Sequence, residues 1–417
     1  MTKNRSVFTK GRMMQEAQHP NKLRILLAVA GLKQREAAQE SGIPEGTLRH
    51  YVAGEQVIPR KDRVKLAQIL GCGVQDLAPH YTILERKPIK MAVGHVMADE
   101  RAKESSSFEE WDGCFSFGDL KTTWMVLDGD GIAEYTPATL QCHYDPQPSK
   151  MASEVEAEKE KIEQEQKQNK EAGKPFQWNG QNYNLFRVLI SRESEEENMT
   201  LDLWFKPSDY YTSLATYRNL DKQDFREKYF PDEDWLYPSP SFVNSIGVNL
   251  TVITADNHVI LTQRSATQGV RPRMFSNSVS ESASRPVDRG TTSLAPDLYR
   301  CASRGLFEEL GLREGRDFAS NDIIFLCFGA DTQYGLYGPR GMIKTQRTSS
   351  EILRSWNNGV KDRMESKKLL ALPFNPKDVV SFVLSHDPWF PGALPGLYFT
   401  LTHEFGREEV DKAISSY

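Results

Sequence analysis

The segment Ala302-Ser-Arg-Gly-Leu-Phe-Glu-Glu-Leu-Gly-Leu312 contains the pattern on which the fold prediction depends. Read as a helix, it places Arg304 and Glu308 one turn apart, with Glu309 beside them. Gly311 then ends the helix, because glycine readily adopts the left-handed conformation of a helix C-terminus. Neighbouring carboxylates near a helix end, set after a glycine-containing loop, suit a divalent cation that holds a diphosphate.

This segment resembles the Nudix box, a Gly followed after five residues by Glu and after seven more by Arg-Glu-apolar-x-Glu-Glu-x-Gly-apolar. The positions in register are Gly290, Arg304, Leu306, Glu308, Glu309, Gly311 and Leu312. Two positions depart from the pattern, since Pro296 stands at the first Glu and Gly305 at the Glu after Arg. The resemblance implies an α/β/α Nudix-like sandwich over residues 243–417.

The resemblance also implies a site for Mg²⁺. Glu308 and Glu309 would bind the ion, which bridges a diphosphate and positions water, and Arg304 would orient the two carboxylates. Because the box helix lacks a third carboxylate, we expect Glu281 on the preceding strand to be a further metal ligand, with Asp288 as a second candidate. Two uses of the site stay open: hydrolysis with Glu308, Glu309 and Arg304 as catalytic residues, and ligand sensing without turnover.

A second pattern, of four short helices, lies in residues 21–80. Leucines and alanines recur there at helical spacing, and Ser41-Gly42 supplies a tight turn between the second and third helices. Pro44 lies in the first turn of the third helix, where its missing N–H costs little. Two helices joined by a glycine turn, with small alanines on the first, form a helix-turn-helix.

The series resembles the Xre-type helix-turn-helix DNA-binding domain. The matching residues are Gln34, Ala37, Ala38, Gly42, Ile43, Thr47, Leu48, Tyr51, Gly54, Pro59, Leu66, Ala67, Leu70, Gly71 and Leu77. The resemblance implies that the helix over 44–52 lies in the major groove of double-stranded DNA. The residues expected to face base edges or phosphates are Glu45, Thr47, Arg49 and His50. Those expected to contact the DNA backbone are Gln34, Arg60, Lys61 and Arg63.

Residues 81–242 are predicted to form a mixed α/β region. We expect a strand over 122–128, paired strands over 184–190 and 199–205, and a helix that starts near 207–211. Residues 151–172 are mostly charged or amide and lack an apolar stripe, which predicts a solvated helical insertion. The turn at 128–131 lacks the further acidic positions of an EF-hand, so we interpret it as a hairpin turn.

Composition limits the class of protein. The chain has 417 residues and a net charge of −5, yet Lys and Arg exceed Asp and Glu in residues 1–80. This predicts an anionic partner for the first domain, which follows a tail over residues 1–20. No apolar run approaches the roughly 20 residues that span a bilayer, so we expect no membrane partner. Five cysteines without a CxxC pair indicate reduced thiols and a cytoplasmic protein.

Together these patterns predict a multidomain protein. An all-α helix-turn-helix domain precedes the mixed α/β region and the Nudix-like sandwich. The predicted function is transcriptional regulation, in which the sandwich senses a nucleotide or another diphosphate-containing small molecule. Because one small helix-turn-helix contacts few base pairs, we expect a homodimer. Two alternatives stay open: a Mg²⁺-dependent Nudix hydrolase with an accessory helix-turn-helix domain, and a protein-binding adaptor.

Overall fold

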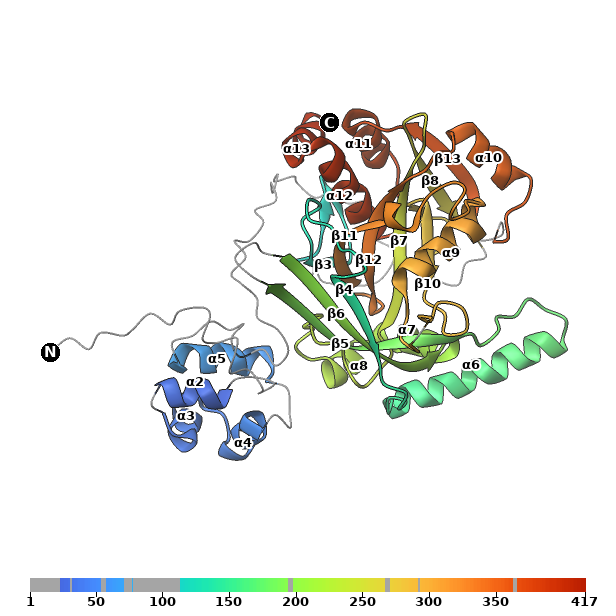
Figure 1. Ribbon diagram of the computed structural model, residues 1–417. Helices are drawn as coiled ribbons and strands as arrows, with labels where there is room; N and C mark the ends of the chain where they lie inside the picture. The colour runs from blue at the N-terminus through green and yellow to red at the C-terminus, as the bar shows by residue number, and fades with distance from the viewer. Residues whose placement is uncertain are drawn as a thin grey trace, which may run out of the picture. The chain divides into compact units, whose positions relative to one another are not determined.

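The computed structural model describes residues 23–30, 32–53, 58–70, 77, 113–193, 198–266, 271–291, 293–362 and 366–417. They belong to two compact units, a small helical unit at the N-terminus and a larger α/β body (Figure 1). The predicted tail over 1–20 and the segment over 81–112 lie outside the described residues. Within the described part of the chain, no helix is both long and apolar enough to cross a membrane.

The N-terminal unit contains four short helices. They are α2 (Leu23–Ala30), α3 (Gln34–Ser41), α4 (Glu45–Ala53) and α5 (Arg60–Leu70). Each helix turns apolar residues inward, and removing them from water stabilises the unit. The buried apolar residues are Leu23, Leu26, Leu27, Ala37, Ala38, Ile43, Leu48, Tyr51, Ile58, Leu66, Ala67 and Leu77.

A tight turn joins α3 to α4. Gly42 has a φ of 68°, in the left-handed region that favours glycine. Ser41 Oγ donates a hydrogen bond of 2.6 Å to the carbonyl oxygen of Ala37 at the end of α3. Farther along, Tyr51 donates a hydrogen bond of 2.9 Å to Asp62 and thereby joins α4 to α5. The first bond thus closes the end of α3, and the second holds α4 against α5.

The body is built on one large mixed sheet. Its strands are β3 (Trp124–Asp128), β4 (Leu140–Tyr144), β5 (Gln181–Glu193), β6 (Asn198–Asp209), β7 (Ser245–Ile253), β8 (His258–Arg264), β9 (Phe275–Ser276), β10 (Val279–Ser282), β11 (Ile324–Asp331), β12 (Leu336–Lys344) and β13 (Ser366–Pro373). The main path runs β3-β11-β12-β7-β5-β6-β4, and β10 and β8 pair with β7 beside it. A separate hairpin joins β1 (Ser116–Phe117) to β2 (Leu120–Lys121). The predicted mixed α/β class is confirmed for the body.

The strands of the middle region belong to this same sheet. Strand β3 pairs with β11, and β5 pairs with β7 through Asn184 and Ser245. The predicted boundary between residues 242 and 243 therefore falls between strands of one sheet. Between the short strands β9 and β10, Ser278 hydrogen-bonds to the carbonyl oxygen of Ile260 in β8.

Helices surround the sheet. They are α6 (Ser153–Glu171), α7 (Tyr210–Leu220), α8 (Gln223–Tyr229), α9 (Leu298–Leu310), α10 (Ser349–Asn357), α11 (Pro376–Ser385), α12 (Ala393–Phe405) and α13 (Arg407–Ser416). The sequence predicted α6 as a solvated helix, but it packs against α7 and buries Val155, Ile162 and Gln166. Helices α11, α12 and α13 share one apolar core with β7, β8 and β11.

Strand β7 carries helices on both of its faces. Successive side chains of a strand point to opposite faces. Val248 pairs with Glu281 of β10, whose side chain lies against Gly305 of α9. Asn249, the next residue of β7, lies instead against Gly396 of α12. Helices α9 and α12 therefore cover opposite faces of this strand.

Candidate functional site

Helix α9 contains the box residues and has well-defined ends. Asp297 precedes it and accepts hydrogen bonds from the backbone N–H groups of Tyr299 at 3.1 Å and Arg300 at 3.0 Å. Such side-chain bonds satisfy donors that a helix start leaves without partners. At the other end Gly311 has a φ of 73°, and the N–H of Leu312 donates to Leu306 O at 3.1 Å. The N–H of Gly311 donates to Phe307 O at 2.9 Å, so the helix ends at this glycine, where the sequence predicts it.

Gly305 permits unusually close packing of α9 on β10. A Cβ atom added at Gly305 would lie 2.7 Å from Val279 Cγ1 and 3.0 Å from Glu281 Cβ. Any side chain at this position would force the helix and the strand apart. Glycine inside a helix costs about 0.5–1 kcal/mol relative to alanine, and the close contact with β10 compensates for it. The same contact brings Glu281 beside the α9 carboxylates.

Arg304 lies at the centre of a group of carboxylates. Its guanidinium contacts Asp288 through two hydrogen bonds of 2.8 and 2.7 Å. Its Nη1 atom lies 3.2 Å from Glu281 Oε1 and 3.0 Å from Glu308 Oε2. A planar guanidinium with several donors holds carboxylates in defined positions. Arg304 thus orients Glu281 and Glu308 toward each other.

Three carboxylates converge beside Arg304. Single oxygen atoms of Glu281, Glu308 and Asp362 all lie within 4.8 Å of one another. Carboxylate oxygens are the ligands that Mg²⁺ prefers, and Mg²⁺–O distances of about 2.0–2.1 Å place opposite ligands about 4 Å apart. These residues therefore fit a small divalent cation after a modest contraction. The ammonium group of Lys361 contacts Glu308 and supplies positive charge there.

The surroundings shift the pKa values of Glu308 and Asp362 in opposite directions. Burial opposes ionisation of Glu308, but hydrogen bonds from Lys361 and Arg304 outweigh it and lower the pKa of Glu308. Burial raises the pKa of Asp362, and the negative charge of Glu308 raises it further. One carboxylate is therefore held ionised, while its neighbour is disposed to retain a proton or to accept a cation.

Glu309 and Asp288 have other partners. Glu309 is buried, and its Oε1 atom accepts a hydrogen bond of 3.0 Å from the backbone N–H of Ser280 in β10. It is not a member of the carboxylate group formed by the described residues. Asp288 is fully buried and binds Arg304 and the N–H of Ser284 at 2.7 Å. Both carboxylates fasten α9 and Arg304 to the strand side of the site.

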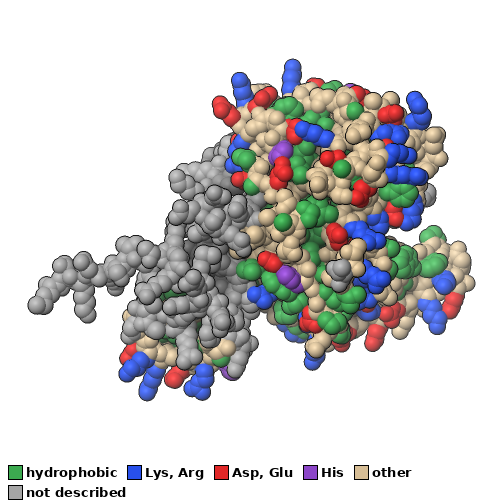
Figure 2. All heavy atoms as spheres, viewed as in Figure 1, with side chains coloured by type: hydrophobic (Ala, Val, Ile, Leu, Met, Phe, Trp, Pro, Cys, Tyr) green, Lys and Arg blue, Asp and Glu red, His purple; other side chains and the backbone are tan. Residues whose placement is uncertain are grey.

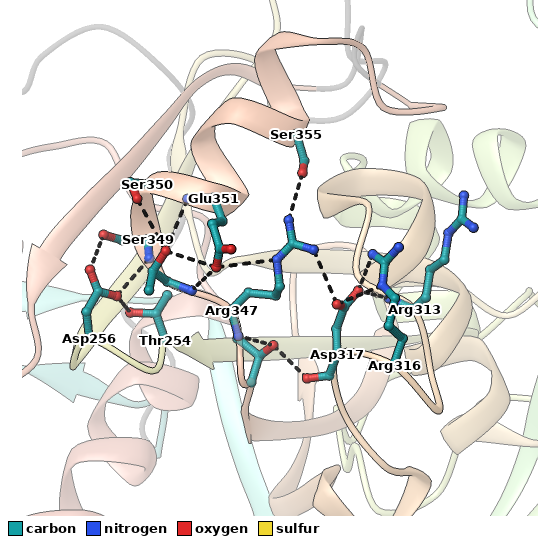
Figure 3. A network of polar contacts seen from close by, with 12 residues as sticks. Thr254, Asp256, Arg313, Arg316, Asp317, Arg347, Ser349, Ser350, Glu351 and Ser355 are labelled. Carbon is teal, nitrogen blue, oxygen red and sulfur yellow. Dashed lines mark hydrogen bonds and ion pairs between the residues drawn. The ribbon is translucent and has the colours of Figure 1, made fainter.

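The position of Asp362 depends on α10. Asp256 accepts hydrogen bonds of 2.7 Å from both the backbone N–H and the hydroxyl of Ser349, at the start of this helix (Figure 3). Arg347 bonds Asp317 and Ser355 at 3.4 Å each. These contacts hold α10 between the turn after β7 and the loop after α9.

The chain returns to α9 after α10 ends. There the backbone N–H of Asp362 donates a hydrogen bond of 2.9 Å to the carbonyl oxygen of Glu308. This bond brings the side chains of Lys361 and Asp362 to the carboxylates. Neither residue carries a sequence signal, because both are outside the box and close to it only through α10.

Basic side chains lie beside this network. Arg316 pairs with Asp317 at 2.6 Å, and the guanidinium of Arg313 stacks over the ring of Phe307 in α9 at 5.4 Å. Lys and Arg side chains also gather on the surface over α10 (Figure 2). Their positive field favours an anionic ligand near the end of α9.

The residues predicted to bind DNA are placed by α3, α4 and α5. Glu45, Arg49 and His50 are exposed on α4, and Lys61 is exposed on α5. Thr47 and Gln34 are half-buried, in α4 and at the first residue of α3. Arg63 is buried, so the expected backbone contact is not available to it. The side chain of Arg60 lies outside the described residues.

Comparisons with known proteins give little. No protein-family model matches the chain, and no curated protein matches it. Among solved structures, the chain is similar to the crystal structure of DR0079 from Deinococcus radiodurans, with 11% sequence identity and a TM-score of 0.23. The likeness covers 35% of this chain and 75% of that chain. So low a TM-score supports no conclusion about fold or function.

Proposed function

We propose that this protein is a DNA-binding transcriptional regulator whose body binds a nucleotide or another diphosphate-containing small molecule. The observation that carries the first half is the α3–Gly42–α4 turn, which leaves Glu45, Arg49 and His50 exposed along one helix. A short helix that presents polar and basic side chains from such a turn suits the major groove of DNA. A homodimer places two of these helices on successive half-sites.

The carboxylate group on α9 supports the second half of the proposal. Glu281, Glu308 and Asp362 offer oxygen ligands to Mg²⁺, which would neutralise a diphosphate beside them. Arg313 and Arg316 lie in the loop directly after α9 and add positive charge. Binding of the ligand in the body is proposed to change the spacing of the two DNA-binding helices in the dimer.

The test of DNA binding uses Arg49→Ala. The full-length protein first selects duplexes from a random pool, and affinity for the selected DNA is then measured by fluorescence anisotropy at fixed salt. Loss of a groove contact by Arg49 should weaken binding by roughly 1–3 kcal/mol. The control is Arg354→Ala, which removes an exposed arginine of α10. Equal affinities of the two variants would contradict the assignment of α4 to the groove.

The test of the cation site uses Glu281→Gln and Asp362→Asn. Each change removes a charged oxygen ligand while keeping the size of the side chain, so Mg²⁺ binding measured by calorimetry should disappear. Glu160→Gln, an exposed residue of α6, serves as the matched control and should bind Mg²⁺ as the unaltered chain does. An unchanged Mg²⁺ titration for Glu281→Gln would rule out its role as a ligand.

A second candidate function is Mg²⁺-dependent hydrolysis of a nucleoside diphosphate derivative. The convergence of three carboxylates favours it, because such a group can position both a cation and an attacking water. Release of phosphate or mononucleotide from a panel of nucleoside diphosphate derivatives, with and without Mg²⁺, separates the two functions. Ligands that stabilise the protein and are recovered intact support the regulator, whereas cleaved ligands support the hydrolase.

A further inference from the structure

A buried arginine lies on the face of the sheet opposite α9. Arg340 in β12 has 2% of its surface exposed, and its guanidinium stacks on the ring of Trp124 at 3.7 Å. Its Nη1 atom donates to the backbone carbonyl of its neighbour Pro339 at 3.1 Å, while its Nε atom has no hydrogen-bond partner among the described residues. Among the described residues, no carboxylate forms an ion pair with it.

Asp331 is the acidic residue whose charge acts on Arg340, and it already has another partner. Asp331 pairs with the guanidinium of Arg271 at 2.7 Å and also accepts a hydrogen bond of 2.7 Å from Thr123. Stacking on Trp124 compensates for only part of the cost of removing the guanidinium from water. Among the residues that the structure describes, no carboxylate in contact with Arg340 is therefore left to neutralise its charge.

Two asparagines beside Arg340 also have polar atoms without partners. Arg340 pairs with Asn249 across the parallel strands β12 and β7, which places their side chains on the same face. Within the part of the chain that the structure describes, neither Nδ2 nor Oδ1 of Asn249 forms a hydrogen bond, although the residue is 1% exposed. Asn277 is fully buried and donates to Thr251 at 2.8 Å, but its Oδ1 atom has no partner. Buried polar groups are nearly always paired, so this cluster calls for a further partner.

The start of α12 closes over the same three side chains. Two of its glycines permit the approach, because a Cβ at Gly392 would lie 2.6 Å from Arg340 Nη2, and one at Gly396 would lie 2.6 Å from Asn277 Nδ2. Gly392 is the N-cap of α12 and has no side chain to cap the helix. A helix N-terminus carries partial positive charge. The guanidinium and the helix start thus bring like charges together.

Water would satisfy the amide groups but would not neutralise the guanidinium. An oxyanion does both, because its oxygens accept hydrogen bonds from Arg340, from an asparagine amide and from a helix N-terminus. We propose that Arg340, Asn249 and Asn277, beneath the first turn of α12, form a binding site for a small oxyanion, either a free ion or the carboxylate or phosphate group of a larger ligand. The site lies across β7 from the α9 carboxylates and is independent of the function proposed above.

The test compares thermal unfolding of the full-length protein in sodium phosphate, sodium acetate and sodium chloride at equal ionic strength and pH. Phosphate or acetate should raise the unfolding temperature above that in chloride, because both fill the site. Phosphate also stabilises proteins in general, because it is excluded from their surfaces, so the informative rise is the part that depends on Arg340. Such a rise with phosphate alone identifies a phosphate-type ligand, and with acetate alone it identifies a carboxylate. Unfolding temperatures equal to that in chloride for both ions would overturn the proposal.

Two variants locate the effect. Arg340→Met should abolish the part of the rise that exceeds the general salt effect. In chloride it should unfold at a higher temperature than the unaltered chain, because it removes a buried charge that lacks a counter-ion. Arg218→Met, with the same change of charge at an exposed position of α7, should keep the full rise. An Arg340→Met chain that fails to fold, or unfolds at a lower temperature in chloride, would assign a structural role to Arg340 and overturn the proposal.

Asn249→Leu provides a separate check, since it keeps the charge of Arg340 and removes only the amide. It should fold and show a smaller rise with the same oxyanion. A rise as large as that of the unaltered chain would also contradict the proposed site.

Discussion

At the scale of single residues, Gly305 and Asp362 determine the geometry around Arg304. Gly305 lets α9 approach β10 so closely that Glu281 reaches the carboxylate of Glu308. Asp362 arrives from a distant part of the chain and completes the group. The helix itself has glycine where the Nudix pattern has a carboxylate. Glu281 of β10 and Asp362 of the loop after α10 supply the further carboxylates.

Gly305→Ala tests the close contact between α9 and β10. Alanine is the better helix former by about 0.5–1 kcal/mol, but its methyl group would overlap Val279 and Glu281. Overpacking typically costs about 1–3 kcal/mol, so we expect a net loss of stability in urea unfolding. The control is Gly46→Ala in α4, where an added Cβ meets no atom within 4 Å and should cost nothing. A Gly305→Ala chain as stable as the unaltered one would contradict the packing described here.

The sequence predicted only some of these residues. Arg304, Glu308 and Glu309 were identifiable because a helix repeats every 3.6 residues and so places them near one another. Glu281 was expected because the helix lacked a carboxylate at position 305. Asp362 was not predicted, since contacts between residues far apart in the chain depend on how α10 packs and leave no local pattern. Nor did local pattern indicate that Glu309 bonds to the backbone of β10.

At the scale of elements, α10 depends on a carboxylate outside it. Asp256 lies in the turn between β7 and β8 and accepts two hydrogen bonds from Ser349, while Thr348 caps the same helix from within. The polar residues of this turn separate two apolar strands, as is typical of a hairpin connection. No local pattern predicted that Asp256 accepts hydrogen bonds from a helix start 93 residues later, because such a contact depends on tertiary packing.

Asp256→Ala tests this cap. Loss of a capping side chain typically costs about 1 kcal/mol, and we expect a loss of this size at neutral pH. Partial burial opposes ionisation of Asp256, but hydrogen bonds from Thr254 and Ser349 hold its pKa well below the usual range. The stabilisation is therefore present above the ordinary pKa of aspartate, about 4, and is lost as pH falls toward the lower folded-state pKa.

Chemical unfolding of both chains at a series of pH values measures this difference. The stabilities of Asp256→Ala and the unaltered chain should converge in acid. Glu160→Ala, at an exposed position of α6, is the control and should differ little from the unaltered chain at any pH. A difference that persists unchanged in strong acid would show that the carboxylate charge is not responsible.

At the scale of the whole molecule, the body is held together by strands from both sides of the predicted boundary at 242/243. Strand β3 covers β11 and buries Trp124 completely, and β5 joins β7. Sequence patterns predicted β3, β5 and β6 but not their order in the sheet, because pairing between distant strands is fixed by the packed sheet. Cutting the chain at residue 243 would therefore separate strands that are hydrogen-bonded in one sheet.

Truncation tests this unity. A fragment of residues 243–417 exposes the edge of β11 that β3 covers, and we expect it to aggregate or to unfold without a cooperative transition. A fragment of residues 113–417 keeps the whole sheet and should unfold cooperatively, as followed by circular dichroism. Cooperative unfolding of the shorter fragment at the temperature of the longer one would instead support an independent domain after residue 242.

The alternation of side chains along β7 also bears on how the protein can diverge. Adjacent codons specify Val248, on the α9 side, and Asn249, on the α12 side. Selection can therefore alter the chemistry of one face by changing alternate codons while leaving the other face untouched. Among related genes, position 249 should covary with positions 340 and 396. Position 248 should covary with positions 281 and 305, independently of the first set.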